Sequence, residues 1–195
     1  MSTETTFIPI SVYIEQTPNP KTMKFVANML LVKNSFDFPN KEQAKNAPLA
    51  AYLFELDYVS RVFLAKNYVT ITIKDEFAWD EVMMEMRDYV NHFLKTNTIL
   101  VTDREAKVSL AETTDLVSKQ IAALIDQHVT PLTLSDGGNI TFKSYNPDTK
   151  IVEVIPQGAC FSCPSIGQTL KTGVEAMLKD MLSDKVIGIK PVKVE

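Results

Sequence analysis

Four short stretches of this chain are predicted β-strands: SVYIEQT (11–17), TMKFVAN (22–28), VSRVFLA (59–65) and YVTITIK (68–74). In TMKFVAN and YVTITIK polar and apolar residues alternate, at the spacing that a β-strand requires. In the last of them Val69 and Ile71 share one face, and Thr70 and Thr72 share the other. This pattern predicts a half-buried hairpin whose two strands are joined at Lys66-Asn67.

Helical spacing appears on either side of this hairpin. From about Ala78 to Thr96 the apolar residues recur three or four positions apart, which predicts an amphipathic helix lying on the sheet. Before the hairpin, Asn40 is a candidate cap for a short helix, which Pro48 breaks or restarts. These elements together predict one unit of strands and helices in the first half of the chain.

A second unit follows a polar stretch that has no sustained period. It begins with a helix capped by Thr113 or Thr114, and Pro131 falls just beyond the end of that helix. Asp136-Gly137-Gly138 predicts a turn that tolerates positive φ. The elements expected after this turn are the strands NITFKSY (139–145) and KIVEVIP (150–156), an amphipathic helix over 166–181 and the final strand VIGIKPVKV (186–194).

The predicted fold class is α+β, with two small domains that each pack helices on a short mixed sheet. We expect the first domain over residues 1–97, a linker over 98–112 and the second domain over 113–195, with the element order αββαβ. A chain of 195 residues is long enough for two small domains.

Composition narrows the classes of partner and compartment. The net charge of −4 and the lack of a lysine- and arginine-rich run predict no nucleic-acid partner, because phosphate binding needs a basic surface. No stretch approaches the roughly 20 apolar residues of a spanning helix, so we expect no membrane partner. The chain has no lysine or arginine before Lys21, unlike a secretory signal or a transit peptide, and this predicts a cytoplasmic location.

Both cysteines of the chain, Cys160 and Cys163, lie in the segment GACFSCPS (158–165). Pairs at this spacing ligate metals, bind iron–sulfur clusters or cycle through a disulfide. In a reducing cytoplasm such a pair is expected to perform metal or redox chemistry. The pair falls between a predicted strand end and a predicted helix start, where free N–H groups and the helix dipole favour a thiolate.

The number of ligands is the main constraint on a metal centre here. Structural zinc sites and iron–sulfur clusters take four protein ligands, and one chain supplies two thiolates. His92 and His128 are the candidates for completing the set within one chain, although each fits a structural or surface role better. The simplest completion is a two-fold axis, on which two chains each contribute one pair.

At these residues the sequence resembles a known family. DGGNITF, followed from residue 157 by QGACFSCPSIGQTLKTGVEAML, is similar to the carboxy-terminal NifU-type domain of Nfu iron–sulfur scaffold and carrier proteins. The segment TPNPKTMKFVAN (17–28) resembles the amino-terminal domain that precedes this module in many members. The chain departs from the family pattern at Thr130-Pro131, where arginine ordinarily precedes the proline.

The resemblance implies a specific function. Cys160 and Cys163 would hold a 4Fe–4S cluster, or alternatively a 2Fe–2S cluster, bridged between the subunits of a homodimer. The implied partners are a second copy of the chain, an upstream scaffold that donates the cluster, and apo iron–sulfur proteins that accept it. The resemblance implies a carrier and not an enzyme.

Two other readings of the cysteine pair stay open. One is a thiol–disulfide redox protein that uses the same two thiols. The other is a zinc-stapled dimeric interaction module, which needs the same four thiolates as a cluster. The first unit has no catalytic constellation, and we predict that it is a docking domain that chooses donors or acceptors.

Overall fold

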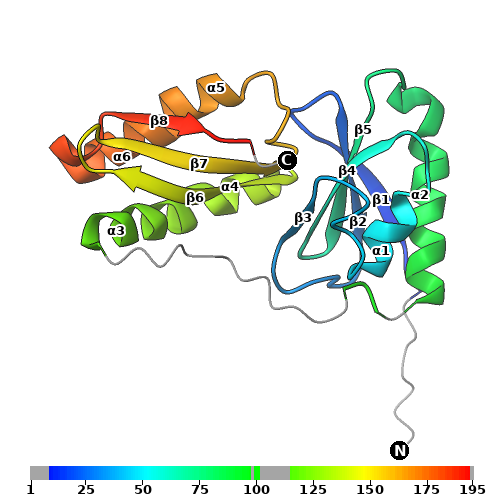
Figure 1. The fold of residues 1–195 in the computed structure, drawn as a ribbon. Coiled ribbons are helices and arrows are strands. Elements are labelled where there is room, and N and C mark those ends of the chain that lie inside the picture. The colour runs from blue at the N-terminus through cyan, green and yellow to red at the C-terminus, as the bar shows by residue number, and fades with distance from the viewer. Residues whose placement is uncertain (1–8, 98, 102–114, 194–195) are drawn as a thin grey trace, which may run out of the picture.

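The structure is a computed structural model of the chain, and it describes residues 9–97, 99–101 and 115–193. Two separate sheets organise these residues, a sheet of five strands in the first domain and a sheet of three in the second (Figure 1). The α+β class and the two domains are therefore confirmed. Residues 98 and 102–112 of the predicted linker lie outside the described residues, and its boundaries stay a prediction.

The first sheet is antiparallel throughout, whereas the sequence analysis expected a mixed sheet. Its strands are β1 (Val12–Gln16), β2 (Thr22–Ala27), β3 (Phe36–Phe38), β4 (Val59–Ala65) and β5 (Tyr68–Ile73), in the order β1-β2-β5-β4-β3. Short turns join β1 to β2 and β4 to β5, and a connection this short can only produce an antiparallel pair. The three-residue strand β3 has too few residues to show alternation, and the sequence analysis missed it.

Helices α1 (Pro48–Leu53) and α2 (Trp79–Thr96) cover one face of this sheet (Figure 1). The side chains between the helices and the sheet are fully buried, among them Phe25, Leu49, Leu53, Ile71, Met86 and Val90. Asn40 accepts a hydrogen bond from Gln43 N at 3.0 Å, but residues 41–46 form turns and the helix begins only at Pro48. Proline suits this position because the first helical residue needs no N–H partner.

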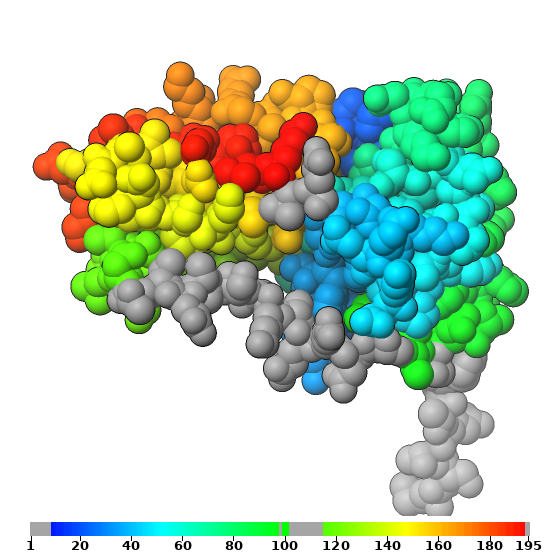
Figure 2. All heavy atoms as spheres, in the orientation of Figure 1, coloured from blue at the N-terminus to red at the C-terminus, as the bar shows by residue number. Residues whose placement is uncertain are grey.

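The other face of the first sheet carries no helix, and yet it is buried. We call it the helix-free face; its residues are Lys24, Val26, Arg61, Phe63, Ala65, Tyr68, Thr70 and Thr72, and each is less than 10% exposed. The prediction of a half-buried hairpin is therefore wrong. The second domain covers this face, and Figure 2 shows the two domains in contact across it.

The second domain has the predicted order αββαβ and a mixed sheet. Strand β6 (Gly138–Asn146) pairs antiparallel with β7 (Ile151–Gly158), and β7 pairs parallel with β8 (Gly188–Pro191). Its core joins these strands to the two helical runs through Ile121, Ile125, Ile140, Val152, Val154, Leu170 and Leu178.

Each helical run of this domain contains a π-helical segment. The first run comprises α3 (Leu116–Leu124), η1 (Ile125–Val129) and α4 (Thr130–Ser135), so Pro131 lies inside the run and not beyond it. The second comprises α5 (Ile166–Gln168), η2 (Thr169–Val174) and α6 (Glu175–Leu182), followed by the short 3-10 segment η3 (Ser183–Lys185).

The cap of the first helical run differs from the one expected. Asp115 caps α3 by accepting a hydrogen bond from Ser118 N at 2.8 Å, whereas the predicted caps Thr113 and Thr114 lie outside the described residues. Among the helices of the described residues, none combines the length and apolar character needed to cross a membrane.

Candidate metal centre

The cysteine loop, residues 159–165, connects the end of β7 to the start of α5. Two backbone turns shape it: Cys160 N donates to Gln157 O, and Ile166 N donates to Cys163 O, each at 3.1 Å. Both thiols are free and partly exposed. The two turns bring Cys160 and Cys163 to the wall of one cavity.

This cavity is small, about 60 Å³. Its walls come from the cysteine loop, from both helical runs of the second domain, and from the β1–β2 turn of the first domain. The lining residues are Pro18, Asn19, Thr133, Asp136, Ile140, Ala159, Cys160, Cys163, Ser165, Ile166 and Thr169. Because the first domain contributes part of the wall, the thiols lie at the contact between the two domains.

The Gly138 backbone lies directly against Cys160. A Cβ at this position would lie 2.7 Å from both the backbone N and the Sγ of Cys160, closer than any packed pair of atoms allows. The sequence analysis assigned this glycine only to a turn. Its missing side chain creates the space in which the sulfur sits, so the site fits a thiol ligand that faces the cavity.

The Gly138→Ala variant is expected to disturb the cysteine loop, because the added methyl group forces the backbone or Cys160 to move. Overpacking of this kind costs about 1–3 kcal/mol of unfolding free energy. Gly173→Ala is the matched control, since no atom lies within 4 Å of its added Cβ. Thermal unfolding followed by circular dichroism checks the pair, and equal stability of the two variants would contradict the assigned role of Gly138.

Burial dominates the electrostatics of Cys160. It raises the pKa of the Cys160 thiol to about 12, and nearby Cys163 and Asp136 add to the shift because a second negative charge disfavours the thiolate. The expectation that the helix start favours a thiolate is therefore wrong for Cys160. The second helical run begins only at Ile166, six residues after Cys160, and a helix dipole acts mainly within the first turn, so it does not offset the loss of water.

Cys163 has a polar neighbour on its own loop. Its Sγ lies 3.1 Å from the Ser165 hydroxyl, which can donate to the sulfur. Among residues 9–97, 99–101 and 115–193, no three His, Cys, Asp or Glu side chains gather in a way that would hold a metal ion. His92 and His128 thus do not complete a site with the cysteines, and one chain offers half of a four-thiolate set.

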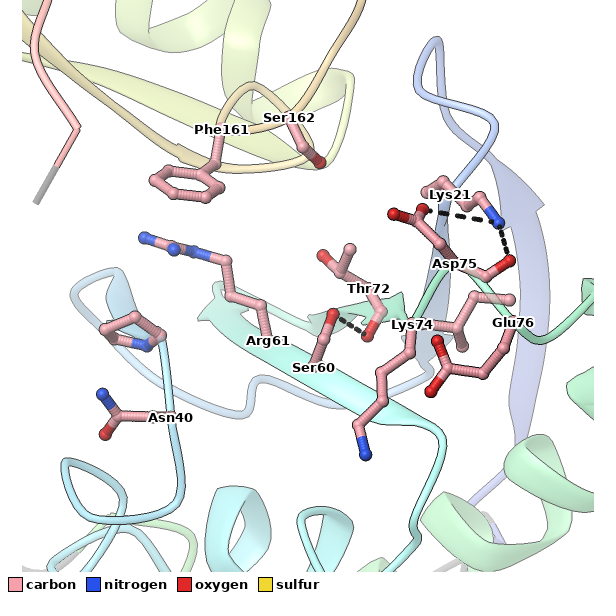
Figure 3. Close-up of a pocket in the computed structure, with 12 residues that line it drawn as sticks. Lys21, Asn40, Ser60, Arg61, Thr72, Lys74, Asp75, Glu76, Phe161 and Ser162 are labelled. Carbon is pink, nitrogen blue, oxygen red and sulfur yellow. Dashed lines mark hydrogen bonds and ion pairs between the residues drawn. The ribbon is translucent and has the colours of Figure 1, made fainter. Parts of the chain in front are cut away.

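Residues of the first domain contact the cysteine loop, and no pattern in the sequence predicts these contacts. Asn19 Nδ2 donates to Ala159 O and to Ser162 Oγ, both at 3.0 Å, although these residues lie about 140 positions away along the chain. The Arg61 guanidinium lies 3.6 Å from the ring centroid of Phe161 (Figure 3). A contact between residues so far apart in the sequence leaves no periodic pattern.

A larger cavity of about 700 Å³ opens on the other side of the loop, where Phe161 and Ser162 face the first domain (Figure 3). Lys21, Lys74, Asp75 and Glu76 line it, and Lys21 Nζ lies 3.7 Å from Asp75 Oδ1. Its charges are mixed and solvated, so the cavity selects no single ligand class.

These features define a two-domain α+β protein that presents a thiol pair on a strand-to-helix loop. Residues 12–97 match the family described as the scaffold protein Nfu/NifU N terminal, and residues 121–188 match the NifU-like domain. The chain therefore belongs to the Nfu/NifU-like proteins.

Curated relatives carry both regions. The chain is 33% identical over 175 residues to "NifU-like protein 4, mitochondrial" of Arabidopsis thaliana, covering 87% of this chain and 62% of that protein. It is 32% identical over 169 residues to "NFU1 iron-sulfur cluster scaffold homolog, mitochondrial" of Drosophila sechellia, covering 85% and 59%. The chain thus spans about three fifths of the length of these relatives.

A solved structure resembles part of the chain. It is the solution NMR structure of a NifU-like protein from Saccharomyces cerevisiae, with 19% identity and a TM-score of 0.45, covering 53% of this chain and 94% of that one.

The predicted cytoplasmic location is contradicted by the curated relatives. The Arabidopsis and Drosophila proteins are named as mitochondrial, which points away from the cytoplasm. The expectation rested on the few residues before Lys21, and the charge of so short a segment does not determine the compartment.

Proposed function

We propose that this chain is an iron–sulfur cluster scaffold and carrier. Cys160 and Cys163 bind a 4Fe–4S cluster that is shared between the two subunits of a homodimer, and the holo-protein transfers it to apo acceptor proteins. The cluster is cargo and the chain is not an enzyme. Its partners are a second copy of itself, an upstream scaffold that supplies the cluster and the apo iron–sulfur proteins that receive it.

One observation carries the proposal: two free thiols on one short loop face the same cavity, and the described residues offer no cluster of three ligands. A cluster needs four ligands, normally thiolates, and two copies of this loop supply them. The name of the Drosophila relative, an iron–sulfur cluster scaffold homolog, supports the cluster over other metals.

A site shared between two chains also suits transfer. When the dimer parts, half of the thiolates leave the cluster, and thiolates of an acceptor can replace them by ligand exchange.

The attacking species in disulfide exchange is the thiolate, and the raised pKa of Cys160 disfavours this thiol as the attacking group in the thiol–disulfide alternative. The zinc-stapled alternative needs the same ligands as a cluster, so the elemental analysis below separates the two.

Reconstitution with iron and sulfide without oxygen tests the proposed function. A 4Fe–4S cluster shared by two chains contains about two irons and two sulfides per chain, and a shared 2Fe–2S cluster contains about one of each. We expect the first ratio in a species of twice the 21.9 kDa chain mass. Zinc without sulfide would support the structural site instead, and a monomer with a full cluster would overturn the proposal.

A further inference from the structure

The helix-free face of the first domain contacts one end of the second domain, the end that carries the cysteine loop. Strands β4 and β5 lie against β7 there, and the Asp136-Gly137-Gly138 turn lies beside the cysteine loop at the same end (Figure 1). The residues in contact come from several elements of each domain, so the contact involves a surface and not a single side chain.

Glycines of the second domain allow this close approach. An added Cβ at Gly158 would lie 2.7 Å from Phe63 Cγ, and one at Gly137 would lie 2.9 Å from Thr70 Oγ1. Both glycines also have positive φ, +54° and +83°. The backbone of the second domain therefore lies directly on side chains of the first sheet.

Apolar side chains fill the rest of this contact. Leu134 of α4 packs against a buried patch of the helix-free face formed by Val26, Phe63, Ala65 and Tyr68. Without the second domain this patch would face water, and burying it is favourable at about 25 cal/mol per Å².

Hydrogen bonds fix the orientation of the two domains. Lys24 Nζ donates to Ser135 O at 2.9 Å, and the Tyr68 hydroxyl donates to Leu134 O at 2.7 Å. On the cysteine loop itself, Asn19 holds Ala159 O and Ser162 Oγ, and its own side chain is 1% exposed. Lys24 and Tyr68 of the helix-free face thus have partners in the second domain, whereas the buried Thr70 hydroxyl has no hydrogen-bond partner.

We infer that the helix-free face is a docking surface for the chain's own cysteine loop, and that the docked arrangement is a closed form in which the first domain partly covers the thiols. The two domains must part before a second chain reaches Cys160. This inference extends the predicted docking role of the first domain, and its consequence for cluster loading rests on the proposed function.

The size of the thiol cavity carries the inference. At about 60 Å³ it has room for only a few water molecules. A 4Fe–4S cluster contains about eight atoms heavier than oxygen, and a second chain must also bring its own two cysteines. Pro18 and Asn19 of the first domain form part of the wall, so moving this domain is a direct way to open the site.

The Leu134→Asp variant tests whether the first domain covers the thiols, and it leaves both cysteines unchanged. It places a carboxylate against the apolar patch of the helix-free face, and moving this charge out of water opposes docking. Leu132→Asp is the matched control, because Leu132 belongs to the same helix α4 and is 68% exposed. Tyr68→Phe, which removes the hydrogen bond to Leu134 O, is a second and milder variant.

The first readout is the labelling of Cys160 by a maleimide in full-length apo-protein that also carries Cys163→Ser. We expect Leu134→Asp to raise the labelling rate about tenfold, because labelling follows the population of the open form. Tyr68→Phe should raise it about threefold, and Leu132→Asp should leave it unchanged. Equal labelling rates in Leu134→Asp and Leu132→Asp would overturn the proposed docking surface. If Leu134→Asp does not fold, the labelling rate of Tyr68→Phe decides the question.

The second readout is the rate of cluster formation in the same variants with both cysteines restored. Faster cluster formation in Leu134→Asp than in Leu132→Asp supports a closed form that limits cluster loading. Equal rates of cluster formation would show that the contact between the domains does not control loading. Labelling needs no iron, so the two proposals can fail separately. If labelling rises and no variant forms a cluster, docking stands and the proposed function is wrong.

Discussion

Replacing Cys163 with serine is expected to remove nearly all of the iron and sulfide that the reconstituted protein retains. A shared cluster that needs four thiolates would find two in a dimer of the variant, so retention should fall to about a tenth or less. A serine hydroxyl does not substitute, because it stays protonated at neutral pH and is a poor ligand for iron. Iron and sulfide analysis after gel filtration, with the visible absorption of the cluster, measures the loss.

The matched control is Ser165→Ala, which removes the hydroxyl 3.1 Å from the Cys163 sulfur and keeps both thiols. It is expected to retain about two irons per chain, since a hydrogen bond to sulfur tunes a cluster and does not hold it. Cys160→Ser should match Cys163→Ser, because each removes two of the four ligands. A Cys163→Ser protein that keeps its colour and about two irons per chain would contradict the assignment of the ligands.

The same variant separates cluster-dependent dimerisation from dimerisation by other surfaces. If the cluster bridges the two chains, its loss should return the protein to the 21.9 kDa chain mass on gel filtration with light scattering. A Cys163→Ser protein that is still dimeric without iron would show that another surface joins the chains, and it would leave the cysteine ligands unchallenged.

Local patterns were sufficient to predict most of the fold. Alternation in YVTITIK located β5, and the three- and four-residue spacing from Trp79 located α2. Both signals arise within one element, where the period of the backbone dictates which side chains face the core. The cysteine pair was predictable for the same reason, because its spacing lies within one loop.

Contacts between the domains were not predictable in this way. Thr70 and Thr72 are polar, and a polar face on a strand ordinarily faces water. Here the second domain buries them, and their exposed fractions are 1% and 8%. The space at Gly138 that accommodates the Cys160 sulfur follows from the same packing of distant segments, for which no period in the sequence exists.

The burial of Arg61 is the most consequential of these contacts for stability. Its guanidinium pairs with Asp37 on the neighbouring strand, with Arg61 Nε 2.9 Å from Asp37 Oδ1, and both side chains are 7% exposed. The same guanidinium lies under the Phe161 ring, and Asp37 Oδ1 also accepts a hydrogen bond from Gly158 N at 3.3 Å. One ion pair thus joins the first sheet to the cysteine loop.

Asp37→Ala is expected to lower the unfolding free energy of the first domain by about 3–5 kcal/mol, because it leaves the Arg61 charge buried without a carboxylate. Trp79, the chain's single tryptophan, lies in the core of that domain, and its fluorescence during urea unfolding measures the change. The control Asp75→Ala removes a carboxylate that is 97% exposed, and it should cost less than about 1 kcal/mol.

A double variant, Asp37→Ala with Arg61→Met, separates the cost of an unpaired charge from the loss of packing. Removing both charges should restore most of the stability that Asp37→Ala loses, since an apolar replacement of a buried ion pair is often neutral. If the double variant is as unstable as Asp37→Ala, the packing of Arg61 under Phe161 and not its charge holds the contact. If Asp37→Ala is as stable as Asp75→Ala, the buried ion pair does not stabilise the first domain.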